Sequence, residues 1–160
     1  MSDSTSTRTP ENTAEIVRAL NGCIETCTDG EKGYGAAAAD VRAPDLKHLC
    51  LESAKQRGTF VLELQAAIRK LGAFPENEGT FSGAVRRDWM TYRRLVEGPD
   101  DRVVLEGCAD GEKASMRAYE AADRAVLHPA PDEIRVLVQH QYAAILSAHS
   151  DIRARLGGGA

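Results

Sequence analysis

The chain has 160 residues, which is enough for one domain with a real hydrophobic core. Its 20 Lys and Arg residues are outnumbered by 24 Asp and Glu residues, and the formal net charge of -4 argues against a nucleic-acid binder or a protein of anionic membrane surfaces. No stretch approaches the roughly 18 consecutive apolar residues of a membrane-spanning helix. These totals favour a single soluble domain.

Residues 1–12 are rich in Ser and Thr and contain no apolar run, so we expect a disordered segment and no signal peptide. The cysteines lie in stretches that have a helical pattern, without the short spacings of a disulfide scaffold or a zinc ribbon. A reducing cytoplasm is therefore the expected location. The four are Cys23, Cys27, Cys50 and Cys108.

A first helix is predicted over residues 13–42, because core-type side chains recur there at steps of three and four. Asn12 followed by Glu15 is a candidate N-terminal cap, and Pro44 ends the pattern. One charged residue, Glu31, lies on this seam. The seam consists of Val17, Leu20, Ile24, Cys27, Glu31, Tyr34, Ala38 and Val41.

A second helix is predicted over residues 45–71, again with one apolar face. Only a few residues separate it from the first helix, so the two must form an antiparallel hairpin. Its apolar face consists of Leu46, Cys50, Phe60, Leu64, Ala67 and Leu71.

About thirty residues, 72–100, follow this hairpin, far more than a tight turn requires. With ~27 residues at 1.5 Å each, the second helix is ~40 Å long, so the connection can run back along it and start the next helix parallel to it. Within this crossover a short amphipathic helix is predicted over residues 80–97. The spacing of Phe81, Val85, Trp89, Tyr92 and Val96 indicates it.

The second half repeats the first. Residues 25–32 (ETCTDGEK) recur as residues 106–113 (EGCADGEK), with six of eight positions identical. Two copies 81 residues apart indicate a duplicated hairpin. Its helices are predicted over residues 101–126 and 132–156, and the second seam glutamate is Glu112. Two hairpins joined by one long crossover define an all-α, ferritin-like four-helix bundle over residues 13–157.

Three stretches of the chain resemble a bacterial family of ferritin-like four-helix-bundle proteins of uncharacterised function. They are Ile24-Glu-Thr-Cys-x-Asp-Gly-x-x-Gly-Tyr34, Gln56-Arg-x-x-Phe60-x-x-Glu-Leu64 and Gln141-Tyr…His149-x-x-Ile-Arg153. The resemblance covers nearly the whole chain after residue 12. It implies the fold and no established activity.

Glu31 and Glu112 suggest a metal site in the bundle core. A buried carboxylate must be partnered, protonated or bound to a cation, and ferritin-like di-iron proteins use such glutamates together with two Glu-x-x-His pairs. No Glu-x-x-His occurs here. The expected ligands are therefore Glu31, Glu112, His149 and Glu63, with di-iron or mononuclear iron as the first choice.

Two alternatives stay open for this layer. Counting the helical rise places Gln56 and Gln141 near the two glutamates, so a hydrogen-bonded structural layer without metal is the alternative. Cys27 and Cys108 lie one turn before the glutamates, and copper or zinc would be favoured if these thiols took part. Core filling is the simpler role for both thiols.

Gly30 and Gly111 fall inside the predicted helices, which indicates close approach of a neighbouring helix or a local π-bulge. The sequence contains no recognisable nucleophile with its base, no phosphate-binding glycine loop and no dinucleotide fingerprint. The competing functional hypothesis is a non-catalytic scaffold or stress-associated homodimer, with the Phe81 and Trp89 side of the crossover as a dimer surface.

Overall fold

A computed structural model describes residues 10–76, 100–127 and 130–157. The described residues form four α-helices: α1 (Pro10–Asp40), α2 (Pro44–Lys70), α4 (Asp101–Val126) and α5 (Asp132–Gly157). The expected all-α class is confirmed. The expected crossover helix over residues 80–97, which contains Phe81 and Trp89, lies outside the described residues.

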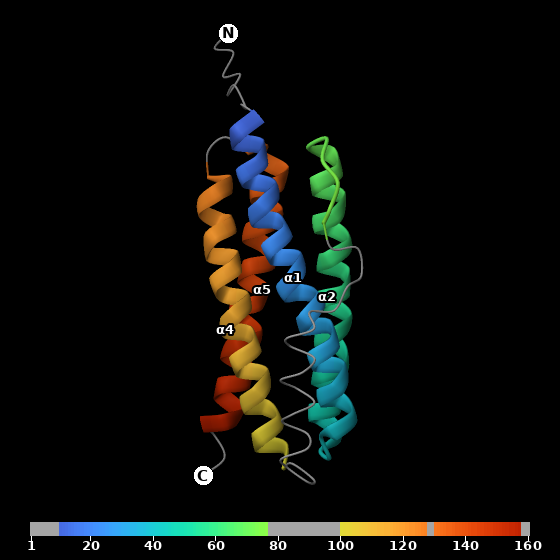
Figure 1. Cartoon of the computed structure of the whole chain (residues 1–160). Helices are drawn as coiled ribbons and strands as arrows, with labels where there is room; N and C mark the ends of the chain where they lie inside the picture. Colours follow the sequence, from blue (N-terminus) through green and yellow to red (C-terminus); the bar gives the residue numbers. More distant parts are fainter. Residues whose placement is uncertain (1–9, 77–99, 128–129, 158–160) are drawn as a thin grey trace.

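The four helices run side by side along one long axis (Figure 1). The α1–α2 and α4–α5 pairs are antiparallel hairpins, whereas α2 and α4 run in the same direction, as the long connection between them predicts. α1 packs against α2 and α4, and α4 also packs against α5. α2 and α5 make only slight contact, so the bundle is less closed on that side. Within the described ranges, no helix is long and apolar enough to span a bilayer.

Capping residues and proline explain where α2 and α4 begin, whereas the start of α1 differs from the prediction. α1 begins at Pro10, three residues before the predicted start, so the proposed cap at Asn12 is wrong because Asn12 lies inside the helix. Pro44 is the first residue of α2, where its missing N–H costs nothing. Asp100 caps α4 by accepting a hydrogen bond from the Val103 N–H at 2.9 Å.

The core consists of two apolar clusters, one above the other. The first includes Cys27, Phe60, Tyr119 and Ile145. The second lies nearer the α1–α2 turn and includes Tyr34, Cys50, Cys108 and Ile152. On α2 and α4, the buried residues between the two clusters are polar: Arg57 on α2, and Glu112 and Ser115 on α4. This level of the bundle holds the candidate site.

The α1–α2 turn is tied to the start of α4. Asp101 accepts hydrogen bonds from the backbone N–H groups of Arg42 at 2.7 Å and Ala43 at 3.0 Å. On the neighbouring helix end, Arg102 donates to the Leu156 carbonyl at 2.9 Å. The Asp101 contacts join the two hairpins at one end and set the register of α1 and α2 against α4, whereas the Arg102 contact ties α4 to α5 within the second hairpin.

Candidate functional site

A buried ion pair between α2 and α4 occupies the centre of the polar layer. The Arg57 guanidinium donates from Nη2 to Glu112 Oε1 at 2.7 Å and from Nη1 to Oε2 at 3.3 Å. The two side chains are only 1% and 2% exposed, respectively. Because both carboxylate oxygens face both terminal nitrogens, the pair is bidentate, the geometry that suits arginine best.

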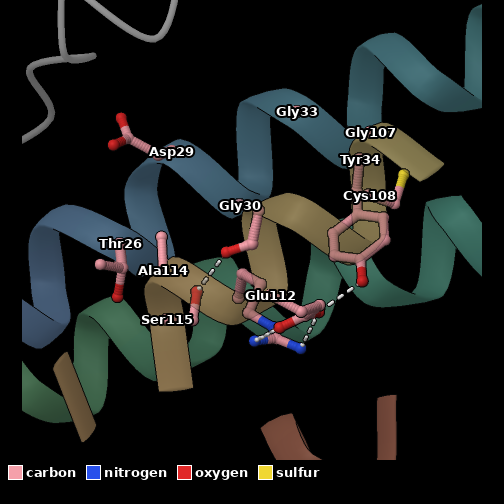
Figure 2. Close-up of a pocket in the computed structure, with 12 residues that line it drawn as sticks. Thr26, Asp29, Gly30, Gly33, Tyr34, Gly107, Cys108, Glu112, Ala114 and Ser115 are labelled. Carbon is pink, nitrogen blue, oxygen red and sulfur yellow. Dashed lines mark hydrogen bonds and ion pairs between the residues drawn. The ribbon is translucent and has the colours of Figure 1, made fainter. Parts of the chain in front are cut away.

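Tyr34 completes the partners of the carboxylate. Its hydroxyl donates to Glu112 Oε1, and Figure 2 shows the two side chains pointing toward one another. The Arg57 guanidinium carbon also lies 5.9 Å from the ring centroids of both Tyr34 and Phe60, within cation–π range. Two aromatic faces and one carboxylate therefore surround the buried charge.

Burial raises the pKa of Glu112 above its ordinary value, and the Arg57 charge and the Tyr34 hydrogen bond oppose that rise. The pKa of Tyr34 is raised by its own burial and by the adjacent Glu112 carboxylate. Tyr34 is therefore a hydrogen-bond donor at any physiological pH. The layer holds a carboxylate and a guanidinium together in the core, where both side chains are at most 2% exposed.

Gly30 makes room for the arginine. A Cβ at this position would lie 3.3 Å from Arg57 Cγ, so the prediction of close approach by a neighbouring helix is confirmed for Gly30. It is wrong for Gly111, the matching residue of the repeat, because a Cβ there would meet nothing within 4 Å. Both glycines lie in regular α-helix, and neither forms a π-bulge.

Glu31 is not equivalent to Glu112 in its surroundings. It is half-buried and lies against Gly58, where a Cβ would come within 3.1 Å of Glu31 Oε1. The expected partner Gln56 is exposed and lines a surface groove between α2 and α5. A structural layer that pairs Glu31 with Gln56 is therefore wrong, because the helix turns the next residue, Arg57, into the core.

A second set of buried, hydrogen-bonded polar groups lies beside the ion pair, within the first apolar cluster. The Tyr119 hydroxyl donates to Gln141 Oε1 at 2.7 Å and lies 3.1 Å from Cys27 Sγ. Since that hydroxyl proton points at Gln141, Cys27 must donate its own proton to Tyr119. Burial, the main cause, raises the pKa of Cys27 to about 11, in keeping with a protonated thiol.

The remaining predicted ligands are spread over the layer. Gln141 Nε2 donates to Glu63 Oε1 at 3.4 Å, but Glu63 is otherwise exposed. His149 is half-buried and close enough to Glu112 for its charge to lower the pKa of that carboxyl, and its Nε2 atom is buried without a hydrogen-bond partner. In the described part of the chain, no three His, Cys, Asp or Glu side chains form a group that could hold a metal ion.

The two cysteines of the repeat have separate environments. Cys27 belongs to the first apolar cluster and Cys108 to the second, so the expected convergence of these thiols on one region is wrong. Cys108 instead shares the second cluster with Cys50 on α2. The two thiols stay apart because the two clusters lie at different heights along the bundle, and the periodicity of the sequence does not reveal that separation.

A cavity of about 150 Å³ borders the ion pair (Figure 2). Its wall is formed by α1 and α4, with Arg57 reaching it from α2. The absent side chains of Gly33 and Gly111 leave open space, since a Cβ at either position would meet nothing within 4 Å. The functional groups on the wall are those of Thr26, Asp29, Tyr34, Arg57, Cys108, Glu112 and Ser115.

Arg57 is the central residue that the sequence reasoning missed. The predicted apolar face of the second helix passed from Cys50 to Phe60, a gap of ten residues. Arg57 fills that gap, seven residues after Cys50 and seven before Leu64, in step with a core-facing seam. An arginine at such a spacing could have been paired with one of the two seam glutamates.

The fold and the buried carboxylate together define a ferritin-like four-helix bundle with an internal arginine at its centre. The profile of the family described as Domain of unknown function (DUF2383) matches residues 15–124, and the chain belongs to that family. The predicted membership of a ferritin-like family of unknown function is thus confirmed. No curated protein matches the sequence.

Three solved structures share the fold. A ferritin-like, diiron-carboxylate protein from Bacillus anthracis str. Ames is 18% identical, with a TM-score of 0.74 over 92% of this chain and 99% of its own. The bacterioferritin-related protein of Bacteroides fragilis, a dodecameric thioferritin, is 14% identical, with a TM-score of 0.72 over 91% and 86%. Dps92 from Deinococcus radiodurans is 16% identical, with a TM-score of 0.73 over 90% and 87%.

Proposed function

We propose that this protein is a non-catalytic ferritin-like bundle whose core carboxylate is neutralised by an arginine instead of a metal ion, and which acts through its surface as a homo-oligomer. The observation that carries the proposal is the bidentate contact of Arg57 with Glu112 in a core where both side chains are at most 2% exposed. The runner-up is an iron-binding protein.

The donor set does not fit a di-iron centre. Glu112 Oε1 already accepts from Arg57 and Tyr34, and Oε2 accepts from Arg57. The guanidinium cannot lose its proton, so a metal ion that took the carboxylate would leave a buried, unpaired positive charge. Removing one partner of a buried ion pair costs about 3–5 kcal/mol, which a metal site would have to offset.

The surface supports a role in assembly. Leu51 and Leu62 are 52% and 68% exposed on α2, and they lie eleven residues apart, which places them on one face of that helix. On α5, Val136 is 61% exposed and Leu146 is 40% exposed. Large apolar side chains on two neighbouring helices favour burial against another protein surface. A second copy of this chain is the simplest occupant, and one structure of the same fold is dodecameric.

The iron hypothesis keeps one observation in its favour. His149 Nε2 is buried without a hydrogen-bond partner, and its ring is electrostatically coupled to Glu112. A metal ion held by Glu31, Glu112, His149 and Glu63 would satisfy that nitrogen. Copper or zinc would replace iron if Cys27 and Cys108 took part. The negative net charge continues to argue against a nucleic-acid partner, and the four free thiols support a cytoplasmic location.

Iron binding by purified protein separates the two functions. We expect no stoichiometric iron in protein prepared without chelator, and none after anaerobic addition of Fe(II) and gel filtration, measured by elemental analysis. Glu112→Gln and His149→Ala should behave like the unchanged chain. Stoichiometric iron in the unchanged chain that is lost in both variants would establish the metal site and overturn the non-catalytic proposal.

A further inference from the structure

The cavity beside the ion pair extends from exposed residues to the buried charges of the core (Figure 2). On α4 its wall includes Gly111 and Ala114, which are both exposed. At its inner end the wall includes Arg57 and Glu112, whose side chains are 1% and 2% exposed. A molecule that enters between α1 and α4 can therefore reach the buried guanidinium.

Glycines create the space in this cavity. α1 contributes Gly30 and Gly33 to the wall, and α4 contributes Gly107 and Gly111. A Cβ at Gly33 or Gly111 would meet nothing within 4 Å, so neighbouring side chains do not take up the space. The cavity of about 150 Å³ is large enough for a molecule of the size of benzene.

The Arg57 guanidinium has one N–H group that the ion pair does not use. Nη1 and Nη2 donate to Glu112, whereas Nε is buried and has no hydrogen-bond partner among the described residues. Nε is bonded to Cδ, which lies beside Gly30 on the cavity wall, since a Cβ at Gly30 would be 3.8 Å from Cδ. A buried donor without an acceptor costs free energy, and an acceptor held in the cavity would remove that cost.

The charges on the wall favour an uncharged acceptor. Glu112 already neutralises Arg57, and Asp29 adds a second carboxylate to the wall. An anion would therefore add to an excess of negative charge, and a cation would face the guanidinium. The rest of the wall is mainly apolar. This surface suits the apolar body of an organic ligand better than water, because a bound water needs several polar partners.

We propose that the cavity between α1 and α4 binds a small, uncharged organic molecule whose oxygen atom accepts a hydrogen bond from Arg57 Nε. The apolar body of the ligand lies against the glycines and Ala114, and a carbonyl or ether oxygen points toward the guanidinium. Binding leaves the contact between Arg57 and Glu112 intact. The proposal does not depend on whether the chain forms a homo-oligomer.

An NMR titration of the full-length, ¹⁵N-labelled chain with cyclopentanone tests the site. This ketone has as many non-hydrogen atoms as benzene. We expect saturable shifts of the backbone amide signals of Gly30, Gly33 and Gly111, and a downfield shift of the Arg57 Nε–H proton. Cyclopentene, a ring of the same size without the oxygen, should not move the Arg57 proton downfield. The butyrate anion should bind at least about tenfold more weakly than cyclopentanone.

Three results of the titration would overturn the proposal. They are the absence of saturable shifts with cyclopentanone, an Arg57 Nε–H signal that stays in place at saturation, and equal affinities for butyrate and cyclopentanone. The first result would show that the cavity holds only water. The second would remove the assigned hydrogen bond, and the third would remove the preference for an uncharged ligand.

Matched glycine variants locate the site. Gly33→Leu adds a side chain at the cavity wall and should weaken cyclopentanone binding by at least about tenfold. Gly35→Leu is the control, because Gly35 is an exposed residue of the same helix that does not line the cavity, and its affinity should be unchanged. Leucine favours helix over glycine, so both variants should keep a helical circular-dichroism spectrum. Gly111→Leu replaces Gly33→Leu if that spectrum is lost. Equal affinities of the wall variant and the control would contradict the assignment.

Discussion

The charge of Arg57 is tolerated in the core because its surroundings are arranged around it. Glu112 supplies an opposite charge at 2.7 Å, and the rings of Tyr34 and Phe60 lie 5.9 Å from the guanidinium carbon. Taking two charges out of water costs several kcal/mol per ion, and good geometry is needed to recover that energy. Such a pair specifies how α2 sits against α4 more than it adds stability.

Breaking the pair should therefore be costly. Arg57→Ala leaves the Glu112 carboxylate buried without its cation, and we expect a loss of about 3–5 kcal/mol in the free energy of unfolding, measured by urea denaturation. The matched control is Arg155→Ala, which removes the exposed pair with Asp45 at 2.9 Å and should cost about 0–1 kcal/mol. The double variant Arg57→Met/Glu112→Leu should lie closer to the unchanged chain than Arg57→Ala does. Similar losses for the two arginine variants would show that the core pair is not structurally important.

At the scale of the helices, the matching glycines of the repeat have different packing environments. Gly30 on α1 allows Arg57 to pass at a Cβ distance of 3.3 Å, whereas Gly111 on α4 borders open space. The same residue at matching positions of the repeat is thus required for packing in one hairpin and only leaves room in the other. Arg57 on α2 is the cause of the difference.

Alanine at the two positions should give opposite results. Gly111→Ala should stabilise the protein by about 0.5–1 kcal/mol, because alanine favours helix and its methyl group meets no neighbour. Gly30→Ala gains the same helix propensity but presses on Arg57 Cγ, so we expect no gain or a net loss. Thermal unfolding followed by circular dichroism would measure both. A larger gain for Gly30→Ala than for Gly111→Ala would contradict this account of the repeat.

At the scale of the whole molecule, the side formed by α2 and α5 is the least closed. These two helices make only slight contact, and a groove lined in part by Leu49, Phe60 and Ala148 runs between them. Leu51 and Leu62 are exposed on the same helix, α2. A single chain has no further helix among the described residues with which to cover this side, which is why a second copy is the proposed occupant.

Leu62→Glu should separate the copies without unfolding them. A carboxylate cannot be buried in an apolar interface without a partner, so sedimentation velocity should show a smaller assembly than for the unchanged chain, with the same helical spectrum. Ala121→Glu, at an exposed position on α4, is the matched control and should leave the mass unchanged. An unchanged mass for Leu62→Glu would remove this face from the proposed interface.

Most of the architecture could be predicted from the sequence. The three-and-four spacing from Val17 to Val41 and its repetition after residue 101 predict the helices, and the length of the segment after Leu71 predicts that α4 runs parallel to α2. Hydrophobic periodicity is a local property, so it can be read without knowing the neighbours. Some observed helix ends differ from the predicted ones by a few residues, as at Pro10, because a few weak contacts decide where a helix begins.

The partners of the seam glutamates could not be predicted in the same way. Counting helical rise placed Gln56 beside Glu31, but a difference of one residue rotates a helical side chain by about 100°, and the structure turns Arg57 inward instead. Sequence alone determined that two hairpins form a bundle with a carboxylate on each seam. Only the tertiary structure decided that Glu112 pairs with an arginine while Glu31 stays half-exposed, because buried charge is matched across helices that are distant in sequence.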